Sequence, residues 1–368
     1  MSMKQHLRVP ANTRTSYTAD LGVYIGRFQP FHLGHLHIVI EALKRVRYLT
    51  ILVGSSCVPR SYFNPFTFEE RRAMILASLP VELRGRVFVQ PLLDMTYNDP
   101  AWVVQVQEKA KGAAEHFFPM DGDSVALVGY QKDGTSFYLK MFPQWESIAV
   151  PAFVAAGEDK PLSATPIREG LFDRTAYEVN AVYLPAHALP DEVIQVIAEF
   201  SDTREFENLV EEYEYVKRYK SQFEGLSYPP IFQTVDALVV QSGHILLVKR
   251  KSRPGRGLWA LPGGFLNAHE RIVDAVYREL REETKIKVPD AVLRGSTVAR
   301  ETFDDVHRSA RGRTITSAFL IRLPDGPLPK VKGADDAEKA KWVPLSEVTQ
   351  DKMFEDHFHV IKKMTGMI

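Results

Sequence analysis

The chain has 368 residues, with 46 basic and 46 acidic side chains and an apolar fraction of 45%. A domain usually holds about 100–200 residues, so this length predicts two domains. The balanced charge argues against a nucleic-acid surface, and the single cysteine, Cys57, excludes an intramolecular disulfide and a cysteine-based metal site.

The segment before Leu21 mixes basic residues, proline and polar residues without an apolar run, which argues against a signal peptide. No later stretch reaches the length of a membrane-spanning helix. We therefore expect a cytoplasmic protein with no nucleic-acid and no membrane partner. A homo-oligomer is compatible with this composition.

Residues 21–154 alternate short apolar runs with segments of helical period. This alternation predicts a parallel sheet with crossover helices, that is, an α/β fold with a Rossmann-like N-terminal domain. The expected strands cover residues 23–25, 49–53, 87–90 and 125–128, and the expected helices cover residues 36–47, 68–79 and 101–117.

A histidine-containing loop follows the first predicted strand. Gly26, Arg27 and Phe28 begin the loop, and two histidines lie three residues apart where the next helix starts. Backbone amides and the helix dipole face an anion there, and His32 and His35 can donate hydrogen bonds to phosphate oxygens. The pattern resembles the nucleotidylyltransferase superfamily, which implies nucleotide binding by the loop and catalysis by the histidines.

Residues 163–168, with the sequence SATPIR, form a second motif. The motif is typical of a helix cap followed by Pro166 at the first helical position. The motif resembles the second signature of the superfamily, in which Ser163 and Thr165 hold the β- and γ-phosphates and Arg168 adds charge to the leaving pyrophosphate. An ordinary helix start with a surface arginine is the alternative.

The full string of residues 26–35 is similar to that of the archaeal-type nicotinamide mononucleotide adenylyltransferases. This resemblance implies that ATP and nicotinamide mononucleotide become NAD and pyrophosphate by direct in-line attack. It also implies that Asp94, Asn98 and Trp102 bind the mononucleotide, with the indole stacked on the nicotinamide ring. A core position for Trp102 is the alternative. Residues 99–100 are expected to cap a helix that begins near Trp102.

Residues 190–223 are charged and helical in period, which predicts helices that close the first domain. The Tyr-Pro-Pro run at 228–230 breaks this pattern, because proline pairs stop helices. We therefore predict a first domain over residues 19–224, a linker over 225–230 and a second domain over 231–368.

The second domain has the pattern of an α+β unit. Ser242 and Gly243 form a predicted turn between two strands, and one long helix over residues 272–284 interrupts the strands. The expected strands cover residues 234–241, 245–249, 314–321 and 341–344.

Glu279, Glu282 and Glu283 follow an i, i+3, i+4 spacing on this helix. At 3.6 residues per turn the three carboxylates share one face, where like charges repel. A hard divalent cation such as Mg²⁺ relieves the repulsion and keeps positions open for substrate phosphates. A solvated acidic helix face is the alternative.

The residues around these glutamates remove that alternative. Residues 264–286 match the Nudix box except at its last glycine, which is Lys285 here. A glycine would be free to take a positive φ, so the lysine costs strain but carries no metal chemistry. The resemblance implies that Glu270 and Arg278 brace the loop against the helix. It also implies four ligands for Mg²⁺ or Mn²⁺, namely Glu279, Glu282, Glu283 and the carbonyl of Gly263.

Residues near the C-terminus indicate which diphosphate is cut. The loop with Arg308, Arg311 and Arg313 is suited to phosphates. Residues 335–336 and 354–358 resemble the ADP-ribose-cleaving branch of the Nudix family, which implies products AMP and ribose 5-phosphate. A general base is expected among Glu355, Asp356 and His357. The candidate stacking aromatics, which are equally candidates for the core, are Trp259, Phe303 and Trp342.

Together, the two motif sets resemble bifunctional proteins in which an adenylyltransferase precedes a Nudix domain. Both sets point to NAD-related nucleotides, namely ATP, nicotinamide mononucleotide, NAD and ADP-ribose. Two alternatives are open. In one, the Nudix domain binds ADP-ribose or NAD without cutting it. In the other, a flavin or pantetheine phosphate is the adenylyl acceptor, and NADH or a sugar nucleotide is the Nudix substrate.

Overall fold

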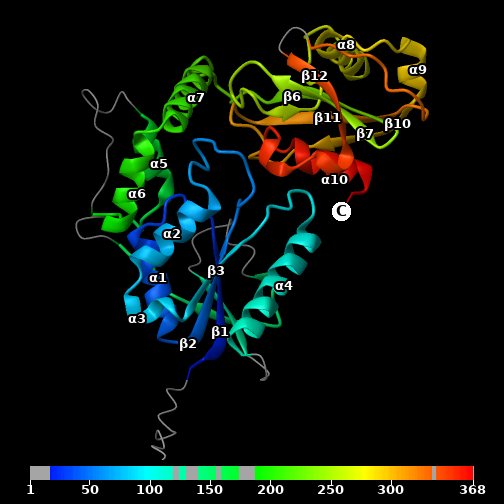
Figure 1. Cartoon of the computed structure of the whole chain (residues 1–368). Coiled ribbons are helices and arrows are strands. Elements are labelled where there is room, and N and C mark those ends of the chain that lie inside the picture. Colours follow the sequence, from blue (N-terminus) through cyan, green and yellow to red (C-terminus); the bar gives the residue numbers. More distant parts are fainter. Residues whose placement is uncertain are drawn as a thin grey trace, which may run out of the picture.

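The structure is a computed structural model that describes residues 17–118, 124–129, 140–154, 159–173, 187–333 and 337–367. These residues form two units of helices and strands, each built on its own sheet (Figure 1). Within these ranges, no helix is both long enough and apolar enough to cross a membrane.

Among the described residues, the N-terminal sheet has five parallel strands in the order β3-β2-β1-β4-β5. The predicted α/β, Rossmann-like fold is confirmed. The sequence pattern misses β5, because only one of its four residues is buried and it presents no apolar run. The strands are β1 (Ala19–Gly26), β2 (Val46–Val53), β3 (Val87–Pro91), β4 (Val125–Gly129) and β5 (Glu146–Ala149).

Helices connect these strands and cover both faces of the sheet (Figure 1). One hydrophobic cluster packs the sheet against α1 and α2, and another packs its opposite face against α4. The charged region after residue 190 folds into two helices, as predicted. The helices are α1 (Leu33–Leu43), α2 (Phe68–Ser78), α3 (Val81–Arg84), α4 (Asp99–Phe117), α5 (Ala164–Phe172), α6 (Asp191–Ser201) and α7 (Arg204–Ser221).

Three predicted helix boundaries are wrong. The helix expected over residues 36–47 ends at Leu43, because the apolar run that continues its period belongs to β2. Helix α4 begins at Asp99, so the side chain of Asn98 is its cap and residues 99–100 are already helical. Pro166 is the third residue of α5 instead of the first.

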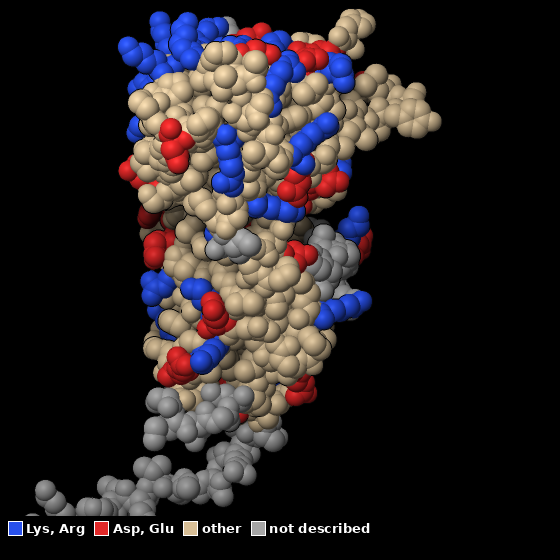
Figure 2. All heavy atoms as spheres, turned by 90° about the vertical axis from the view of Figure 1, so that its right-hand side faces the viewer, with Lys and Arg blue, Asp and Glu red and all other residues tan. Residues whose placement is uncertain are grey.

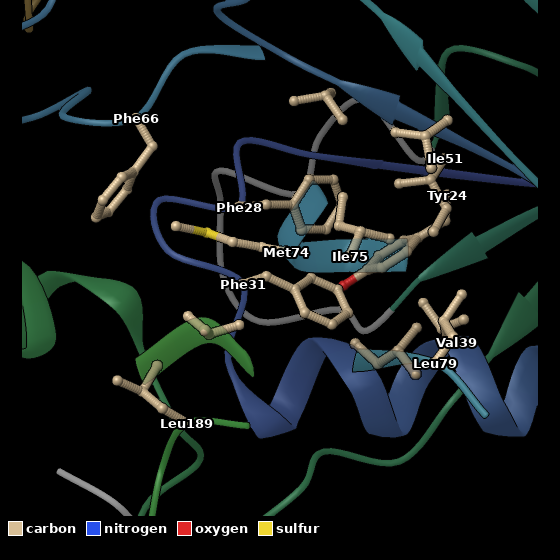
Figure 3. Close-up of a cluster of buried hydrophobic side chains, with 14 of the residues drawn as sticks. Tyr24, Phe28, Phe31, Val39, Ile51, Phe66, Met74, Ile75, Leu79 and Leu189 are labelled. Carbon is tan, nitrogen blue, oxygen red and sulfur yellow. The ribbon is translucent and has the colours of Figure 1, made fainter. Parts of the chain in front are cut away.

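The loop after β1 is anchored in the larger hydrophobic cluster. Phe28 and Phe31 are 1% and 0% exposed, and Figure 3 shows both rings among Tyr24, Val39 and Met74. A buried aromatic ring removes about 150–250 Å² from water, so these two rings hold the loop backbone firmly in place.

Among the described residues, the C-terminal sheet has seven strands, with the central order β10-β11-β6-β7-β12, β8 beside β7 and β9 beside β6. Strands β6 and β11 are parallel and the other pairs are antiparallel, which confirms the predicted α+β class. The strands are β6 (Phe232–Gln241), β7 (His244–Arg250), β8 (Trp259–Ala260), β9 (Gly263–Phe265), β10 (Thr297–Phe303), β11 (Thr314–Arg322) and β12 (Ala337–Pro344).

Helix α8 (Ile272–Thr284) has the predicted bounds. Ser242 and Gly243 have φ of 47° and 72°, which is the pair of positive φ values of a tight hairpin turn. The sequence pattern misses β10, which is mostly exposed, and two helices, α9 (Asp290–Gly295) and α10 (His357–Thr365). Buried histidines on α10 hide its apolar face from a hydrophobicity pattern.

Helix α7 runs toward the C-terminal unit, and α10 lies on the side of that unit that faces the N-terminal sheet (Figure 1). Arg253 pairs with Glu211 of α7, and Glu212 accepts the N–H of Gly255 at 2.9 Å.

Residues 222–231 contain no helix or strand, and the predicted linker lies there. Figure 2 shows acidic and basic side chains interspersed over one face, with a group of Lys and Arg at its upper left corner.

Candidate active sites

The two motifs of the N-terminal unit meet at one cavity of about 280 Å³. Its lining comes from the loop after β1, the first turn of α1 and the start of α5. Ligands bind at the carboxyl ends of strands in open parallel sheets, and this cavity follows the end of β1. The predicted residues on its wall are Gly26, Arg27, Phe28, His32, His35, Ser163, Thr165 and Arg168.

His32 and His35 hold each other in a fixed pose. Their rings stack with centroids 3.6 Å apart and an angle of 18° between the planes. Each ring accepts at Nδ1 the backbone N–H of the other residue, at 3.3 Å in both cases. An accepting Nδ1 places the proton of a neutral imidazole on Nε2, so both rings have the tautomer that donates from Nε2.

Neighbouring rings pack closely on the two glycines of this loop. A Cβ atom on Gly26 would lie 2.7 Å from Cζ of Phe28, and one on Gly34 would lie 3.0 Å from two atoms of the His32 ring. Phe28 itself has a left-handed backbone, with φ of 52°. Because its ring is buried, Phe28 can contribute to a nucleotide site only through its backbone.

Arg168 joins the two motifs. Its guanidinium donates to the carbonyl of Gln29 at 2.7 Å and to Oγ1 of Thr165 at 3.3 Å. Burial lowers the pKa of Arg168 to about 10, with the charge of Arg27 adding to the effect, and the group stays protonated at neutral pH. Ser163 occupies the cap position of α5, but its side chain bonds no helix N–H.

Arg71 of α2 supports the same loop, and the sequence analysis missed it. This side chain is 1% exposed and donates to the carbonyls of Arg27 and Gly54 at 2.7 Å and of Ser55 at 3.0 Å. It thereby ties together the ends of β1 and β2. No sequence signal marks such a residue, because its partners are backbone carbonyls.

The residues expected to bind the mononucleotide lie outside the histidine cavity. Oδ1 of Asp94 accepts the N–H of Ser55 at 3.2 Å, and Oδ1 of Asn98 accepts the N–H of Ala101 at 3.1 Å. Trp102 is half-buried and packs beside Phe142, with ring centroids 6.0 Å apart. Their binding role therefore stays a prediction.

In the C-terminal unit, the α8 glutamates face the β9 strand. Oε2 of Glu283 accepts the N–H of Gly263 at 2.9 Å. A Cβ atom on Gly264 would lie 2.6 Å from Oε1 of Glu279. The carboxylate of Glu279 therefore packs directly on the backbone at Gly264.

Arg278 gathers the other carboxylates of the box. Its Nε and Nη2 bind Glu270 at 2.7 Å and 2.9 Å, which is the expected brace between loop and helix. Its Nη1 lies 2.8 Å from both Glu279 and Glu282. Burial raises the pKa of Glu283 to about 8, with the charge of Glu279 adding to the rise. Burial also raises the pKa of Glu279.

These residues fit a divalent cation after a local rearrangement. Within the described ranges, no three acidic or imidazole side chains are arranged to hold a metal ion. Glu279 and Glu282 instead bind Arg278, and Glu283 is largely buried beside Glu279. Burial and mutual repulsion make the ionised form of these carboxylates unfavourable, which raises their pKa values. A bound divalent cation would offset this cost.

Lys285 has the left-handed conformation that the box glycine predicts. It is the C-cap of α8, with φ of 47° and ψ of 31°, and its N–H bonds the carbonyl of Arg281 at 3.0 Å. A residue with a Cβ atom is strained in this region by about 1–2 kcal/mol. The helix therefore ends in the left-handed conformation typical of glycine, although the residue is a lysine.

The three arginines of the expected phosphate loop have different surroundings. Arg308 is 7% exposed and binds Asp356 through Nε and Nη2 at 2.9 Å and 3.0 Å. Arg311 lies over the ring of Phe265 at 4.9 Å, and Arg313 bonds the carbonyl of Asp304. The role of these three arginines in phosphate binding stays a prediction.

The candidate stacking aromatics belong to the core. Phe303 is 1% exposed, Trp259 packs against the same cluster as Phe303, and Nε1 of Trp342 donates to the carbonyl of Pro329 at 2.8 Å. Residues 335–336 lie outside the described residues.

The candidate general bases have different surroundings. Asp356 is occupied by Arg308, and Nδ1 of His357 accepts the N–H of Leu261 at 2.9 Å. Glu355 is half-buried, accepts the N–H of Ala310 at 3.1 Å and lines a second cavity of about 280 Å³, between the two units. Burial raises the pKa of Glu355. None of the hydrogen bonds and ion pairs in the described ranges joins it to the α8 glutamates.

Comparisons with known proteins match both units. Residues 23–170 match the cytidylyltransferase-like family, and residues 231–364 match the NUDIX domain. A nicotinamide/nicotinic acid mononucleotide adenylyltransferase from Acinetobacter baylyi is 34% identical over 197 residues, which are 54% of this chain and 95% of that protein. An ADP-ribose pyrophosphatase from Methanocaldococcus jannaschii is 34% identical over 128 residues, which are 35% of this chain and 69% of that protein.

The similar solved structures include one that matches nearly the whole chain. It is the crystal structure of a bifunctional NMN adenylyltransferase/ADP ribose pyrophosphatase from Francisella tularensis, complexed with AMP and a manganese ion. The TM-score is 0.85 and the identity 35%, over 95% of this chain and 99% of the other. Both units and their order along the chain are therefore shared with that protein.

Proposed function

Because this chain belongs to the family of bifunctional nicotinamide mononucleotide adenylyltransferase/Nudix hydrolases, we propose that its residues carry out the two reactions of that family. The N-terminal unit transfers AMP from ATP to nicotinamide mononucleotide and releases pyrophosphate. The C-terminal unit hydrolyses ADP-ribose to AMP and ribose 5-phosphate. The similarity over both units and the pyrophosphatase relative do not favour a purely sensing Nudix domain.

For the first reaction, the supporting observation is the cavity that joins the histidine loop to α5. The mononucleotide phosphate attacks the α-phosphorus of ATP in line, and the bond from this phosphorus to the bridging oxygen breaks. Nε2–H groups of His32 and His35 donate to oxygens that gain negative charge as the bond breaks. Thr165 and Arg168 hold the pyrophosphate that leaves.

For the second reaction, the supporting observation is the buried carboxylate pair Glu279 and Glu283 against the β9 backbone. Together with Glu282 and the Gly263 carbonyl, this pair would hold a divalent cation, which supplies positive charge to the diphosphate and activates water. Arg278 would keep its contacts with Glu270, and Glu279 and Glu282 would exchange theirs with Arg278 for contacts with the ion. Glu355 is the proposed general base.

We propose Mg²⁺ as the usual ion and Mn²⁺ as an effective replacement, because both accept carboxylate and carbonyl oxygens. The manganese ion in the Francisella structure is compatible with this choice. A cytoplasmic location stays a prediction, as does assembly into a homo-oligomer.

A substrate panel on the purified full chain tests both assignments. Pyrophosphate release is followed with ATP and each acceptor, which are nicotinamide mononucleotide, nicotinic acid mononucleotide, flavin mononucleotide and pantetheine phosphate. AMP release is followed from ADP-ribose, NADH and a sugar nucleotide. No pyrophosphate release with nicotinamide mononucleotide would refute the first assignment, and no AMP release from ADP-ribose would refute the second.

The Glu283→Gln variant tests the metal ligands of the second site without affecting the first. Loss of one buried ligand charge is expected to reduce AMP release from ADP-ribose by about 100-fold or more and to leave NAD formation unchanged. Glu205→Gln, on the exposed start of α7, is the control and should change neither rate. Cleavage that persists in Glu283→Gln would show that the metal ligands are assigned wrongly.

A further inference from the structure

The loop between β3 and α4 is held by both units of the chain. Asp94 and Asn98, which the family resemblance predicts to bind nicotinamide mononucleotide, are tied to the N-terminal unit through Ser55 and Ala101. Tyr97 lies between them and contacts the C-terminal unit instead. The loop is thus held by the N-terminal unit at Asp94 and Asn98 and by the C-terminal unit at Tyr97.

The Tyr97 contact is specific in geometry. The phenol O–H donates to Oδ2 of Asp356 at 2.6 Å. The ring meets Phe303 edge-on, with centroids 4.9 Å apart and an angle of 70°, and Nζ of Lys363 lies 5.7 Å from the ring centroid. Tyr97 therefore packs as a member of the hydrophobic cluster between the C-terminal sheet and α10.

The acceptor of this hydrogen bond is itself immobilised. Arg308 binds Asp356 through two nitrogens, at 2.9 Å and 3.0 Å, and both side chains are almost fully buried. A hydrogen bond to a buried carboxylate is stronger than one between neutral groups. Arg308, which the sequence predicts to bind a substrate phosphate, thus fixes the carboxylate that accepts the hydrogen bond from Tyr97.

The backbone of Tyr97 supports the same conclusion. Its φ is 70°, in the left-handed region that costs a residue with a Cβ atom about 1–2 kcal/mol. Such a conformation persists where surrounding contacts over-determine it. Here those contacts are Asp356, Phe303 and Lys363, all from the other unit.

We propose that Tyr97 is a positioning residue of the adenylyltransferase, through which the Nudix domain holds the β3–α4 loop in its mononucleotide-binding conformation. This inference rests on the function proposed above. It makes the affinity of the first enzyme for its acceptor depend on a side-chain contact with the second.

The test is the kinetics of NAD formation by full-length Tyr97→Phe, which removes the hydrogen bond and keeps the ring. The KM for nicotinamide mononucleotide is expected to rise about three- to tenfold, because the lost hydrogen bond acts on the mononucleotide site only indirectly, through the loop. The KM for ATP and kcat are expected to stay within about twofold of wild type. ADP-ribose hydrolysis by the same sample reports that the Nudix domain is folded.

Two further variants distinguish positioning from a general loosening of the domains. Asp356→Asn, in the other unit, should raise the same KM, and its effect should not add to that of Tyr97→Phe in the double variant. Arg253→Ala removes the ion pair with Glu211 on α7 and should leave the KM unchanged.

An unchanged mononucleotide KM in Tyr97→Phe would overturn the inference, as would an equal rise in Arg253→Ala. Additive effects of Tyr97→Phe and Asp356→Asn would also overturn it, because the two groups would then act separately. A wild-type chain that forms no NAD from nicotinamide mononucleotide would instead refute the proposed function, whatever the variants do.

Discussion

Single residues of the histidine cavity are preorganised by their own backbone. His32 and His35 each use Nδ1 to accept the other's N–H, so the Nε2–H groups need no reorientation when a nucleotide binds. Donors that are already in place stabilise a transition state more than donors that must first move. The short spacing of the two histidines is the origin of this arrangement.

His35→Ala is expected to lower kcat for NAD formation by about 10²–10³, the usual effect of removing one preorganised donor. The measurement is steady-state NAD formation at saturating ATP and acceptor. His37→Ala on the same helix is the control, because His37 is not part of the cavity wall and packs beside Phe153. A fall of less than about tenfold in His35→Ala would remove this histidine from the catalytic step.

Lys285→Gly is expected to raise the free energy of unfolding by about 1 kcal/mol, because glycine adopts φ near 47° without strain. Urea unfolding of the full chain measures the change, and ADP-ribose hydrolysis should be unaltered. Lys287→Gly, at a nearby exposed position without positive φ, should bring no gain. Equal or lower stability of Lys285→Gly would mean that the lysine compensates its strain through contacts of its side chain.

At the scale of elements, two helices direct their N-termini at one nucleotide cavity. Helix α1 begins beside His32 and α5 begins beside Ser163, and both starts belong to the cavity wall. The partial positive charge of each N-terminus favours phosphate oxygens. The parallel sheet brings the two starts together, because its strands all end at the same edge.

Helix α4 allows a second test, because Asn98 has a structural role in addition to its proposed binding role. Asn98→Ala removes the cap and is expected to cost about 1 kcal/mol of stability. Asn98→Asp keeps the cap, so stability should stay at the wild-type value. If the amide also binds the mononucleotide, both variants raise its KM. A wild-type KM in Asn98→Asp would exclude the binding role.

At the scale of the whole molecule, two kinds of contact join the enzymes. One lies beside the chain connection, where α7 meets Arg253 and Gly255. The other lies between the loops after β2 and β3 and the face of α10, where Tyr97 reaches Asp356. The cavity between the units lies among these contacts and contains Glu212 and Glu355 on its wall.

Glu212→Gln is expected to make the molecule more stable at pH 7 and equally stable near pH 4.5. Burial raises the pKa of Glu212 above its ordinary value of 4.5, and the N–H of Gly255 only partly offsets this. A group whose pKa is raised in the folded state stabilises the fold at pH values below its unfolded-state pKa. This stabilisation is lost as the pH rises through the folded-state pKa. Glutamine avoids that loss.

The measurement is the midpoint of urea unfolding for both proteins between pH 4.5 and pH 8. The expected difference at pH 7 is below about 1 kcal/mol, because Glu212 keeps some contact with solvent. Glu205→Gln at an exposed site of the same helix should show no such pH dependence. A Glu212→Gln chain that is less stable than wild type at pH 7 would contradict this account.

Local chemistry could be predicted from the sequence alone. The three carboxylates on one face of α8 and the paired histidines follow from spacings of a few residues. The left-handed position of Lys285 follows from the resemblance of residues 264–286 to the Nudix box. Covalent connectivity fixes the relative positions of such neighbours once the helix or turn forms. The alternation of strands and helices likewise determined the α/β and α+β classes of the two units.

Only the tertiary structure decided which of these side chains are buried and which partners they have. Arg308 looks like a phosphate ligand in the sequence, yet it is buried against Asp356, and Tyr97 carries no motif, yet it joins the two enzymes. Burial and long-range partners depend on how distant segments pack, and no local spacing encodes them. For the same physical reason, the meeting of the histidine loop with Arg168 at one cavity became visible only in the folded chain.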